Sequence, residues 1–302
     1  DPQKYEGIID SALANADIPF FFAKKTDLCS MPAIKLILSA LRIKRFNWQA
    51  SDLLSHLKTG LCDVDAHDAY LFEEYVNTWN IHGSRFYEGD WNMNPDGFVP
   101  EISERGKEIL ACANKAREAI CQPLMKLFVT LDASDTIADK CRAIYAYICD
   151  IALEDKISLL AQKAAERGDV KQARELARIY SIILTTLADV GEAIGDEEAD
   201  DEELSLILKT IFDKTEIGSI PTSIDEVTLG SAAMLRASGQ KYAMVIGVCE
   251  NEFPAAVDDS GLFTMSDRRA LADLGIDLAG DIDSRSSDEL MYVEREFSVP
   301  SE

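Results

Sequence analysis

Histidine and cysteine are the residues of this sequence best suited to acid–base, nucleophilic or metal chemistry, and there are three histidines and seven cysteines. His56 lies in an apolar helical stretch and His82 stands beside a glycine, neither next to a plausible nucleophile. The cysteines are widely spaced and form no CxxC pair, so zinc and redox motifs are not supported. We therefore interpret the histidines as structural and the cysteines as core thiols typical of a reducing compartment, and we predict no catalytic residue and no metal site.

The sequence also lacks the motifs of several enzyme classes. It contains no GxxxxGK[ST] loop, so it cannot cradle nucleotide phosphates in the P-loop manner, and GxGxxG, HExxH and GxSxG are absent. Residues 196–203 hold seven acidic side chains in eight positions, which could bind a metal ion. Because they lack the alternating ligand spacing of a calcium loop, we predict a solvated loop that leads into a helix.

The densest basic and aromatic cluster consists of Arg42, Lys44 and Arg45 beside Phe46 and Trp48. Cations near aromatic rings suit phosphate contacts and base stacking, so these three cations are candidate DNA-binding residues. The alternative is a helix C-terminus whose cations complement the helix dipole, with Trp48 in the core. The formal net charge of -24 repels nucleic acid at long range, so any contact requires a local basic patch or the help of a partner protein.

The elements that must position these residues differ between the middle and the ends of the chain. Residues 18–22 and 227–229 read as strands, and residues 242–248 form a continuous apolar run typical of a buried parallel strand. Between them, apolar residues recur every three or four positions, as in helices. We predict an α/β fold in which a sheet domain is interrupted by a large, mostly helical insertion, with boundaries that give residues 1–48, 49–215 and 216–302.

Length and hydropathy restrict the class of protein further. No apolar run approaches the roughly 20 residues that span a bilayer, and a secretion signal is missing. The start without methionine suggests a segment cut from a longer polypeptide. These features predict a cytoplasmic protein without membrane contact.

Two separated segments carry a resemblance to a known family. The first holds IPFFF at residues 18–22 and Pro32, and the second holds VTLGS at 227–231 and YAMVIGVCENEFP at 242–254. The pair resembles the second motor domain of UvrD-type superfamily 1 helicases. More closely, it is similar to the AddB/RexB family, the B subunits of the ATP-dependent helicase/deoxyribonuclease. Further matching phrases are NW at 47–48, DLL at 52–54, LKTGL at 57–61, EEYV at 73–76 and IHG at 81–83.

This resemblance implies a fold and a function. The fold would be a RecA-like parallel-sheet domain, helicase-like domain 2A, with residues 49–215 as a 2B-like insertion. The function would be DNA binding and packing against the A subunit of the nuclease, as a heterodimer, in double-strand break resection and homologous recombination repair. The DNA would be a single strand or a duplex end. The rival interpretation is an acidic helical protein–protein interaction scaffold without DNA binding.

The resemblance also suggests which residues meet DNA and which chemistry is missing. Lys24 and Lys25 follow the first strand, where related motors place a loop near nucleic acid, and Thr228, Gly230 and Ser231 fall at a motif that contacts a single strand. A strand end and a turn would explain the last three equally well.

The arginine that active motors carry near the end of this domain would correspond to Val299, so we expect no ATP hydrolysis. The parent protein resembles an ATP-dependent nuclease and thus a hydrolase, but this segment shows no nuclease or ATPase site. The iron–sulfur cluster and magnesium expected of the full-length family belong to a nuclease domain further along that chain, so we expect no cofactor in this segment.

Overall fold

A computed structural model describes residues 2–5, 7–22, 27–215, 225–233, 235, 242–249, 252–255, 264–276 and 282–298. The chain divides into two compact units. One unit comprises residues 26–218 and is called the helical unit here. The other, called the terminal unit, comprises residues 1–25 and 219–302. Each is described by itself.

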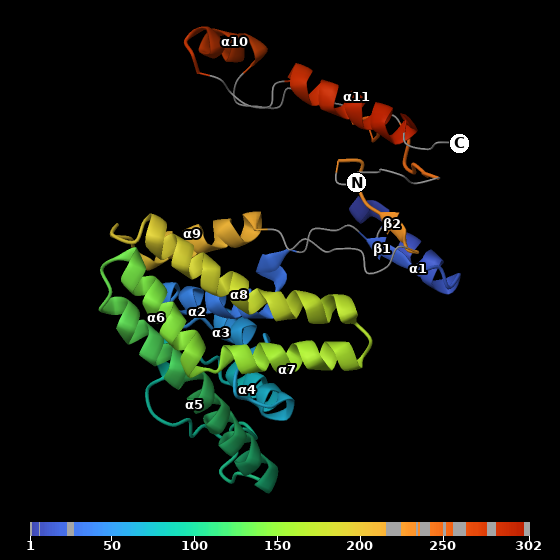
Figure 1. The fold of residues 1–302 in the computed structure, drawn as a ribbon. Coiled ribbons are helices and arrows are strands. Elements are labelled where there is room, and N and C mark those ends of the chain that lie inside the picture. Colours follow the sequence, from blue (N-terminus) through green and yellow to red (C-terminus); the bar gives the residue numbers. More distant parts are fainter. Residues whose placement is uncertain are drawn as a thin grey trace. The chain divides into compact units, whose positions relative to one another are not determined.

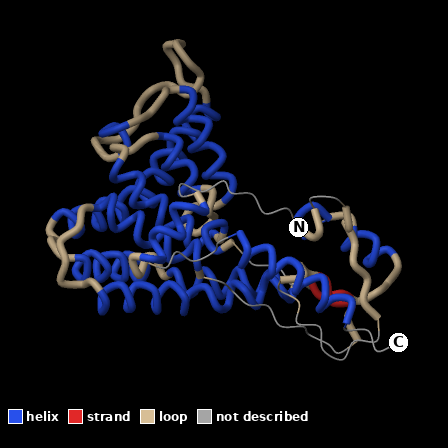
Figure 2. The backbone as a smooth tube through the Cα atoms, turned by 90° about the horizontal axis from the view of Figure 1, so that it is seen from above, coloured by secondary structure: helices blue, strands red, loops and turns tan. Residues whose placement is uncertain are grey.

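The helical unit consists of packed helices, of which α7 and α8 run side by side while α5 crosses them (Figures 1 and 2). Helices α7 and α8 form a hairpin, α5 packs against α4 and α6, and α2 packs against α3 and α9. The bounds are η2 Leu28–Ser30, α2 Pro32–Arg45, α3 Ala50–Leu57, α4 Ala66–Thr78, η3 Gly83–Phe86, α5 Glu104–Asp132, α6 Ile137–Asp150, α7 Leu153–Glu166, α8 Val170–Ala193 and α9 Asp201–Lys214.

Helix ends in this unit are set by side chains that the sequence makes recognisable. Ser103 accepts a hydrogen bond from the amide of Gly106 at 3.0 Å, and Asp169 accepts one from the amide of Gln172 at 2.9 Å. The turn between α7 and α8 passes through Gly168 at φ +84°, a left-handed conformation that glycine adopts without strain. Gly168 thus follows the end of α7, and Asp169 caps the start of α8.

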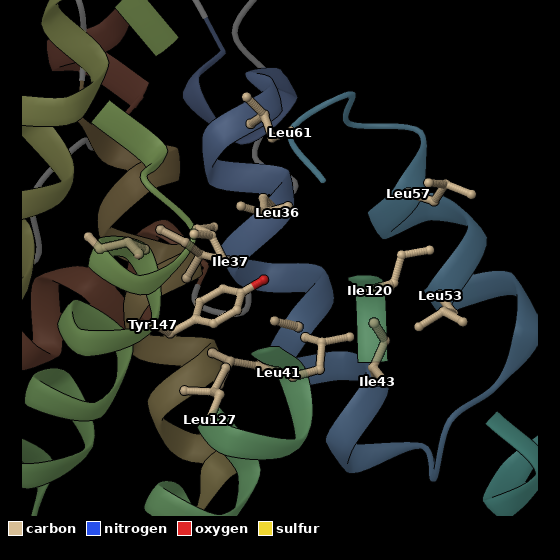
Figure 3. Close-up of a cluster of buried hydrophobic side chains, with 14 of the residues drawn as sticks. Leu36, Ile37, Leu41, Ile43, Leu53, Leu57, Leu61, Ile120, Leu127 and Tyr147 are labelled. Atoms are coloured by element: carbon tan, nitrogen blue, oxygen red, sulfur yellow. The ribbon is translucent and has the colours of Figure 1, made fainter. Parts of the chain in front are cut away.

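The core of the helical unit is apolar and centred on α2. Ile34, Leu36, Ile37 and Ile43 are at most 1% exposed. Figure 3 shows side chains from α2, α3 and α5 meeting there, with Tyr147 of α6 directed at α2. Burial of each such aliphatic side chain contributes roughly 1.5–3 kcal/mol, so this interior dominates the stability of the unit.

In the terminal unit, the described residues form several short segments. Its elements are η1 Pro2–Tyr5, α1 Ile9–Asn15, β1 Phe20–Phe22, β2 Val227–Leu229, α10 Met265–Asp273 and α11 Ile282–Ser298. Strands β1 and β2 pair in parallel, with Phe20 opposite Val227 and Phe22 opposite Leu229. The strands predicted at 18–22 and 227–229 are therefore found, the first in part.

The predicted fold class is nevertheless wrong. In the described part of the chain, the sheet has only two short strands and helices make up most of the structure, so this is not a RecA-like parallel-sheet domain. Residues 242–249 form no strand, and Tyr242 and Met244 are 81% and 89% exposed. A buried strand needs a neighbour on each side, and β1 and β2 pair with each other instead. The interruption by a long helical segment agrees with the prediction.

The predicted boundaries at 48/49 and 215/216 delimit parts of a helicase-like domain and stay a prediction. By compactness, residues 26–48 belong with the helical unit, where α2 packs against α3 and α9. Within the described residues, no helix is both long and apolar enough to cross a bilayer.

The acidic run at 196–203 leads into α9 as predicted, and Asp200 and Glu203 form a capping box at its start. One of its members is not solvated, however. Asp201 pairs with Lys44 of α2 and with Lys140 of α6, the latter at 2.5 Å. Only 17% of the Asp201 side chain is exposed, against 8% for Lys140. The carboxylate therefore ties three helices together.

We expect Asp201→Asn to lower the free energy of unfolding by about 3 kcal/mol, because two largely buried lysines would face each other without a full counter-charge. Urea denaturation of the variant measures this loss. Asp132→Asn is the matched control: Asp132 also pairs with Lys44, at 2.6 Å, but its side chain is 70% exposed, so the loss should stay below about 1 kcal/mol. Equal losses in the two variants would contradict the role of Asp201.

Candidate nucleic-acid interface

A pocket of about 400 Å³ lies in the terminal unit, beside the paired strands. Its lining includes the aromatic residues Tyr5, Phe22, Phe253 and Tyr292, contributed by η1, β1, the segment after residue 251 and α11. Aromatic rings with polar groups at their margins suit a flat, partly apolar ligand such as a nucleobase.

Three of the predicted DNA-binding residues belong to this pocket. Thr228 lies in β2, Gly230 and Ser231 follow the strand directly, and all three line the pocket together with the aromatic residues. Three residues that were predicted to act together thus lie at one site in the structure. Their contact with DNA stays a prediction.

Two carboxylates also line the pocket, and each already has a donor. Glu252 pairs with Lys4 at 2.6 Å, and the hydrogen bond from Lys4 lowers the pKa of Glu252. Glu289 accepts a hydrogen bond from the amide of Ala255 at 3.0 Å. These bonds reduce the repulsion that an approaching phosphate would meet.

The pocket also shows what the sequence analysis missed. Tyr292 lies on α11, which the sequence does not reveal because the apolar residues 290–293 are consecutive instead of three or four apart. Phe253 lies inside the stretch that carries the family resemblance and could have been singled out there. Lys24, Lys25 and Val299 lie outside the described residues.

The cluster of Arg42, Lys44 and Arg45 is placed at the C-terminal end of α2 and is engaged with carboxylates. Arg42 pairs with Asp52 at 3.0 Å, and Arg45 pairs with Glu202 at 2.5 Å. Trp48 is 4% exposed and packs among aromatic rings of the core. These features are those of the alternative account, helix-end cations above a core tryptophan, although the DNA-binding role of the three cations stays a prediction.

The aromatic member of that cluster is better placed for an outside contact. Phe46 is 41% exposed, and the guanidinium groups of Arg42 and Arg45 lie 5.5 and 4.8 Å from the centre of its ring. Such cation–π contacts hold the guanidinium groups over the ring.

The helical unit contains a buried polar chain that resembles a nucleophile and its base. Ser39 Oγ lies 2.9 Å from His56 Nδ1, and the Tyr147 hydroxyl lies 3.2 Å from His56 Nε2. His56 is 1% exposed, so no substrate reaches it from solvent. Ser39 Oγ donates to the carbonyl of Leu36, which makes the chain a satisfied structural network. The structural interpretation of His56 is thus supported by its surroundings.

The described residues include one group with possible metal ligands, formed by Asp27, Cys29 and Asp213. The Asp27 carboxylate caps η2 by accepting from the amide of Cys29 at 2.9 Å, and the thiol points to the carbonyl of Lys209 at 3.8 Å. The pKa of the Cys29 thiol is raised, mainly by burial. The raised pKa disfavours the thiolate form that binds a metal ion. The capping role accounts for this arrangement.

We expect the stability of the helical unit to fall as the pH drops from about 6.5 to 4, through His56. Burial lowers the pKa of His56 from 6.5 to about 4, so in this range the unfolded chain binds a proton that the folded chain does not. Stability is full above the unfolded value, and about 3 kcal/mol is lost by pH 4. Urea denaturation across this range should show a smaller loss for His56→Gln than for the wild type. An unchanged slope would refute this, and His67→Gln, at an exposed histidine, is the control.

We expect Gly247→Ala to destabilise the terminal unit by about 1–3 kcal/mol, because Gly247 has φ +73° and a Cβ there would lie 2.5 Å from the Tyr5 hydroxyl. Tyr5→Phe in the same chain should recover part of the loss, since the nearest remaining ring atoms are at 3.3 Å. Chemical denaturation followed by circular dichroism measures both. A double variant no more stable than Gly247→Ala would rule out this contact as the cause.

Comparison with known proteins shows which curated proteins the chain is similar to. No family model matches the chain. Curated relatives named as the B subunit of the ATP-dependent helicase/deoxyribonuclease do match. The one from Clostridium botulinum (strain Loch Maree / Type A3) is 32% identical over 302 residues, which is 100% of this chain and 26% of the relative.

Two further relatives carry the same name. The one from Acetivibrio thermocellus is 31% identical over 297 residues, 98% of this chain and 26% of its own. The one from Clostridioides difficile is 27% identical over 302 residues, 100% of this chain and 26% of its own. The chain spans about a quarter of the length of these relatives. The resemblance predicted from the sequence is confirmed: along its whole length, the chain is homologous to a segment of the B subunit of the ATP-dependent helicase/deoxyribonuclease.

Proposed function

We propose that this chain is the non-catalytic, DNA-binding helicase-like region of the B subunit of an ATP-dependent helicase/deoxyribonuclease, which works with the A subunit in double-strand break resection and homologous recombination repair. The observation that carries the proposal is the alignment of the whole chain with relatives of that name. Their name describes one of several subunits of a helicase and deoxyribonuclease, and thus implies a partner and DNA as substrate.

In this proposal, the pocket of the terminal unit receives a base of a single strand. The rings of Phe22 and Tyr292 offer stacking surfaces, and the hydroxyls of Thr228 and Ser231 offer hydrogen bonds at the strand end. The lining residues that the structure describes include no lysine or arginine. Phosphate contact therefore falls to Lys24 and Lys25, which follow Phe22 in the sequence by two and three residues.

The region is non-catalytic in this proposal because the groups needed for phosphoryl transfer are missing. The sequence has no P-loop lysine, and valine stands where the resemblance implies an arginine. The buried pair of Ser39 and His56 cannot meet a substrate. ATP hydrolysis, nuclease chemistry, the iron–sulfur cluster and magnesium are left to other parts of the full-length protein.

One observation favours the rival function, an acidic protein–protein scaffold. Arg42, Lys44 and Arg45 are all paired with carboxylates of the same chain, which leaves them little charge to give to phosphates. A scaffold of this kind would bind protein and not DNA, so the two functions differ in a measurable way.

We expect a labelled single strand of about 12 nucleotides to bind the chain with a modest salt dependence. If Lys24 and Lys25 each neutralise one phosphate, affinity should fall about sevenfold between roughly 50 and 200 mM salt. Fluorescence anisotropy measures this, and neutralising both lysines to glutamine should remove most of the salt dependence.

Base stacking in the pocket is tested separately from the phosphate contacts. Tyr292→Ala should weaken binding about tenfold at either salt concentration, because base–aromatic stacking contributes about 1–3 kcal/mol per base. The control is Tyr70→Ala, which truncates a tyrosine that is 63% exposed in the helical unit. Absence of binding at both salt concentrations would contradict the DNA-binding role and favour the scaffold.

A further inference from the structure

The most exposed large apolar side chain of the described residues is that of Phe98, at 99%. It lies in residues 92–103, the second part of the connection between η3 and α5, called the Phe98 loop here. The neighbouring Val99 is 51% exposed. The Phe98 ring makes an edge contact with the Trp79 ring, with the ring centres 5.5 Å apart. Trp79 packs against the core, so Phe98 is presented from a fixed base.

The backbone that carries Phe98 is held by its own side chains. Asn94 Nδ2 donates to the carbonyl of Val99 at 2.9 Å and to that of Glu101 at 3.2 Å. Asp96 accepts from the amide of Ser103 at 2.7 Å and from its hydroxyl at 3.0 Å. The loop is therefore ordered before any partner arrives, which lowers the entropy lost on binding.

Contacts with α4 and α5 also keep the Phe98 loop in a fixed conformation. The Tyr75 hydroxyl donates to the carbonyl of Met93 at 3.0 Å, which fixes the loop to α4. At the other end, a Cβ at Gly106 would lie 2.6 Å from Asp96 Oδ2, so the loop and the first turn of α5 are in close contact. An exposed aromatic ring on such a framework has the form of an interface anchor.

The charge around Phe98 restricts what it can meet. Residues 86–104 contain five exposed acidic side chains and neither lysine nor arginine. Asp90 pairs with Arg117 at 2.6 Å and Glu104 pairs with Lys107 at 2.7 Å, so the acidic charge of this surface comes mainly from Glu88, Asp96 and Glu101. Such a surface repels the phosphates of nucleic acid. It suits a protein whose apolar pocket has a rim of lysine and arginine.

We propose that the Phe98 loop docks into an apolar, cation-rimmed pocket on the companion subunit of the enzyme. The identity of that partner rests on the proposed function. A second copy of this chain is a poor occupant, because the described lining of the terminal unit's pocket includes no lysine or arginine to face the carboxylates of the loop. Phe98 supplies the buried anchor, and the surrounding carboxylates supply the polar rim of the interface.

The test uses the full-length protein that contains this chain and the purified companion subunit from the same organism. Biolayer interferometry should show that Phe98→Ala raises the dissociation constant at least tenfold, mainly through faster dissociation. Phe98→Leu, which keeps apolar volume, should recover part of the affinity. Tyr70→Ala, at another exposed aromatic residue of the helical unit, should change it less than twofold.

Glu101→Lys separates charge from apolar contact. It should slow association, and the difference from the wild type should shrink as salt rises, because rim charges act mainly on the association rate. The proposed docking requires that Phe98 is also exposed in the free full-length protein, so Phe98→Ala should leave the melting temperature of that protein unchanged. A lowered melting temperature would mean that the loop packs inside its own chain, and would overturn the proposal.

Three further outcomes would separate the docking role of the loop from the identity of its partner. Wild-type binding that Phe98→Ala leaves intact would overturn the docking role of the loop while the proposed partner stands. Failure of the wild-type protein to bind the companion would overturn both. A loss of DNA affinity in Phe98→Ala, with companion binding unchanged, would assign the loop to nucleic acid instead.

Discussion

The carboxylate of Asp201 holds two lysines of the helical unit, Lys44 on α2 and Lys140 on α6, against the first turn of α9. Burial alone would raise the pKa of Asp201, but the hydrogen bonds from Lys140 and Lys44 outweigh it and lower the pKa. This bond network anchors the N-terminal end of α9, which then runs along α2 until it reaches η2. The closed arrangement of the unit depends on that anchoring, because α9 brings the end of the helical unit back to its beginning.

The excess of acidic residues restricts which surfaces of this chain can bind DNA or another protein. With 54 acidic residues against 30 basic ones, the chain engages Arg42, Lys44 and Arg45 in internal pairs. We therefore propose that recognition falls to aromatic groups on ordered backbone. One such place is the pocket beside β1 and β2, and the other is the Phe98 loop, and each has its own surrounding of carboxylates.

Local signals in the sequence were sufficient for the helices and insufficient for the sheet. Ser103 and Asp169 mark helix starts because a cap needs only its own neighbours, three residues away. The apolar run at 242–248 has the composition of a buried strand, but burial depends on neighbouring strands, and the described part of the chain pairs only β1 with β2. Composition says what a segment could bury and not whether a partner covers it.

The candidate site shows the same division. Thr228, Gly230 and Ser231 were singled out because they fall in one short motif of the family resemblance, whereas Tyr5 and Tyr292, near the two ends of the chain, meet them only in three dimensions. The partner of Lys44 was missed for the same reason, since Asp201 lies 157 residues from it. Ser39 and His56 are 17 residues apart on different helices, a distance at which no motif spacing applies.

The contact between η2 and α9 has a consequence for how such a chain can change over evolutionary time. Cys29 of η2 and Lys209 of α9 lie side by side, so the polypeptide chain enters and leaves the helical unit at nearly the same point. A module whose two ends meet can gain or lose whole helices, or be exchanged for another, with the entry and exit points kept as they are. Descendants of one ancestral gene could thus diversify through this module while the residues on either side of it kept their original task.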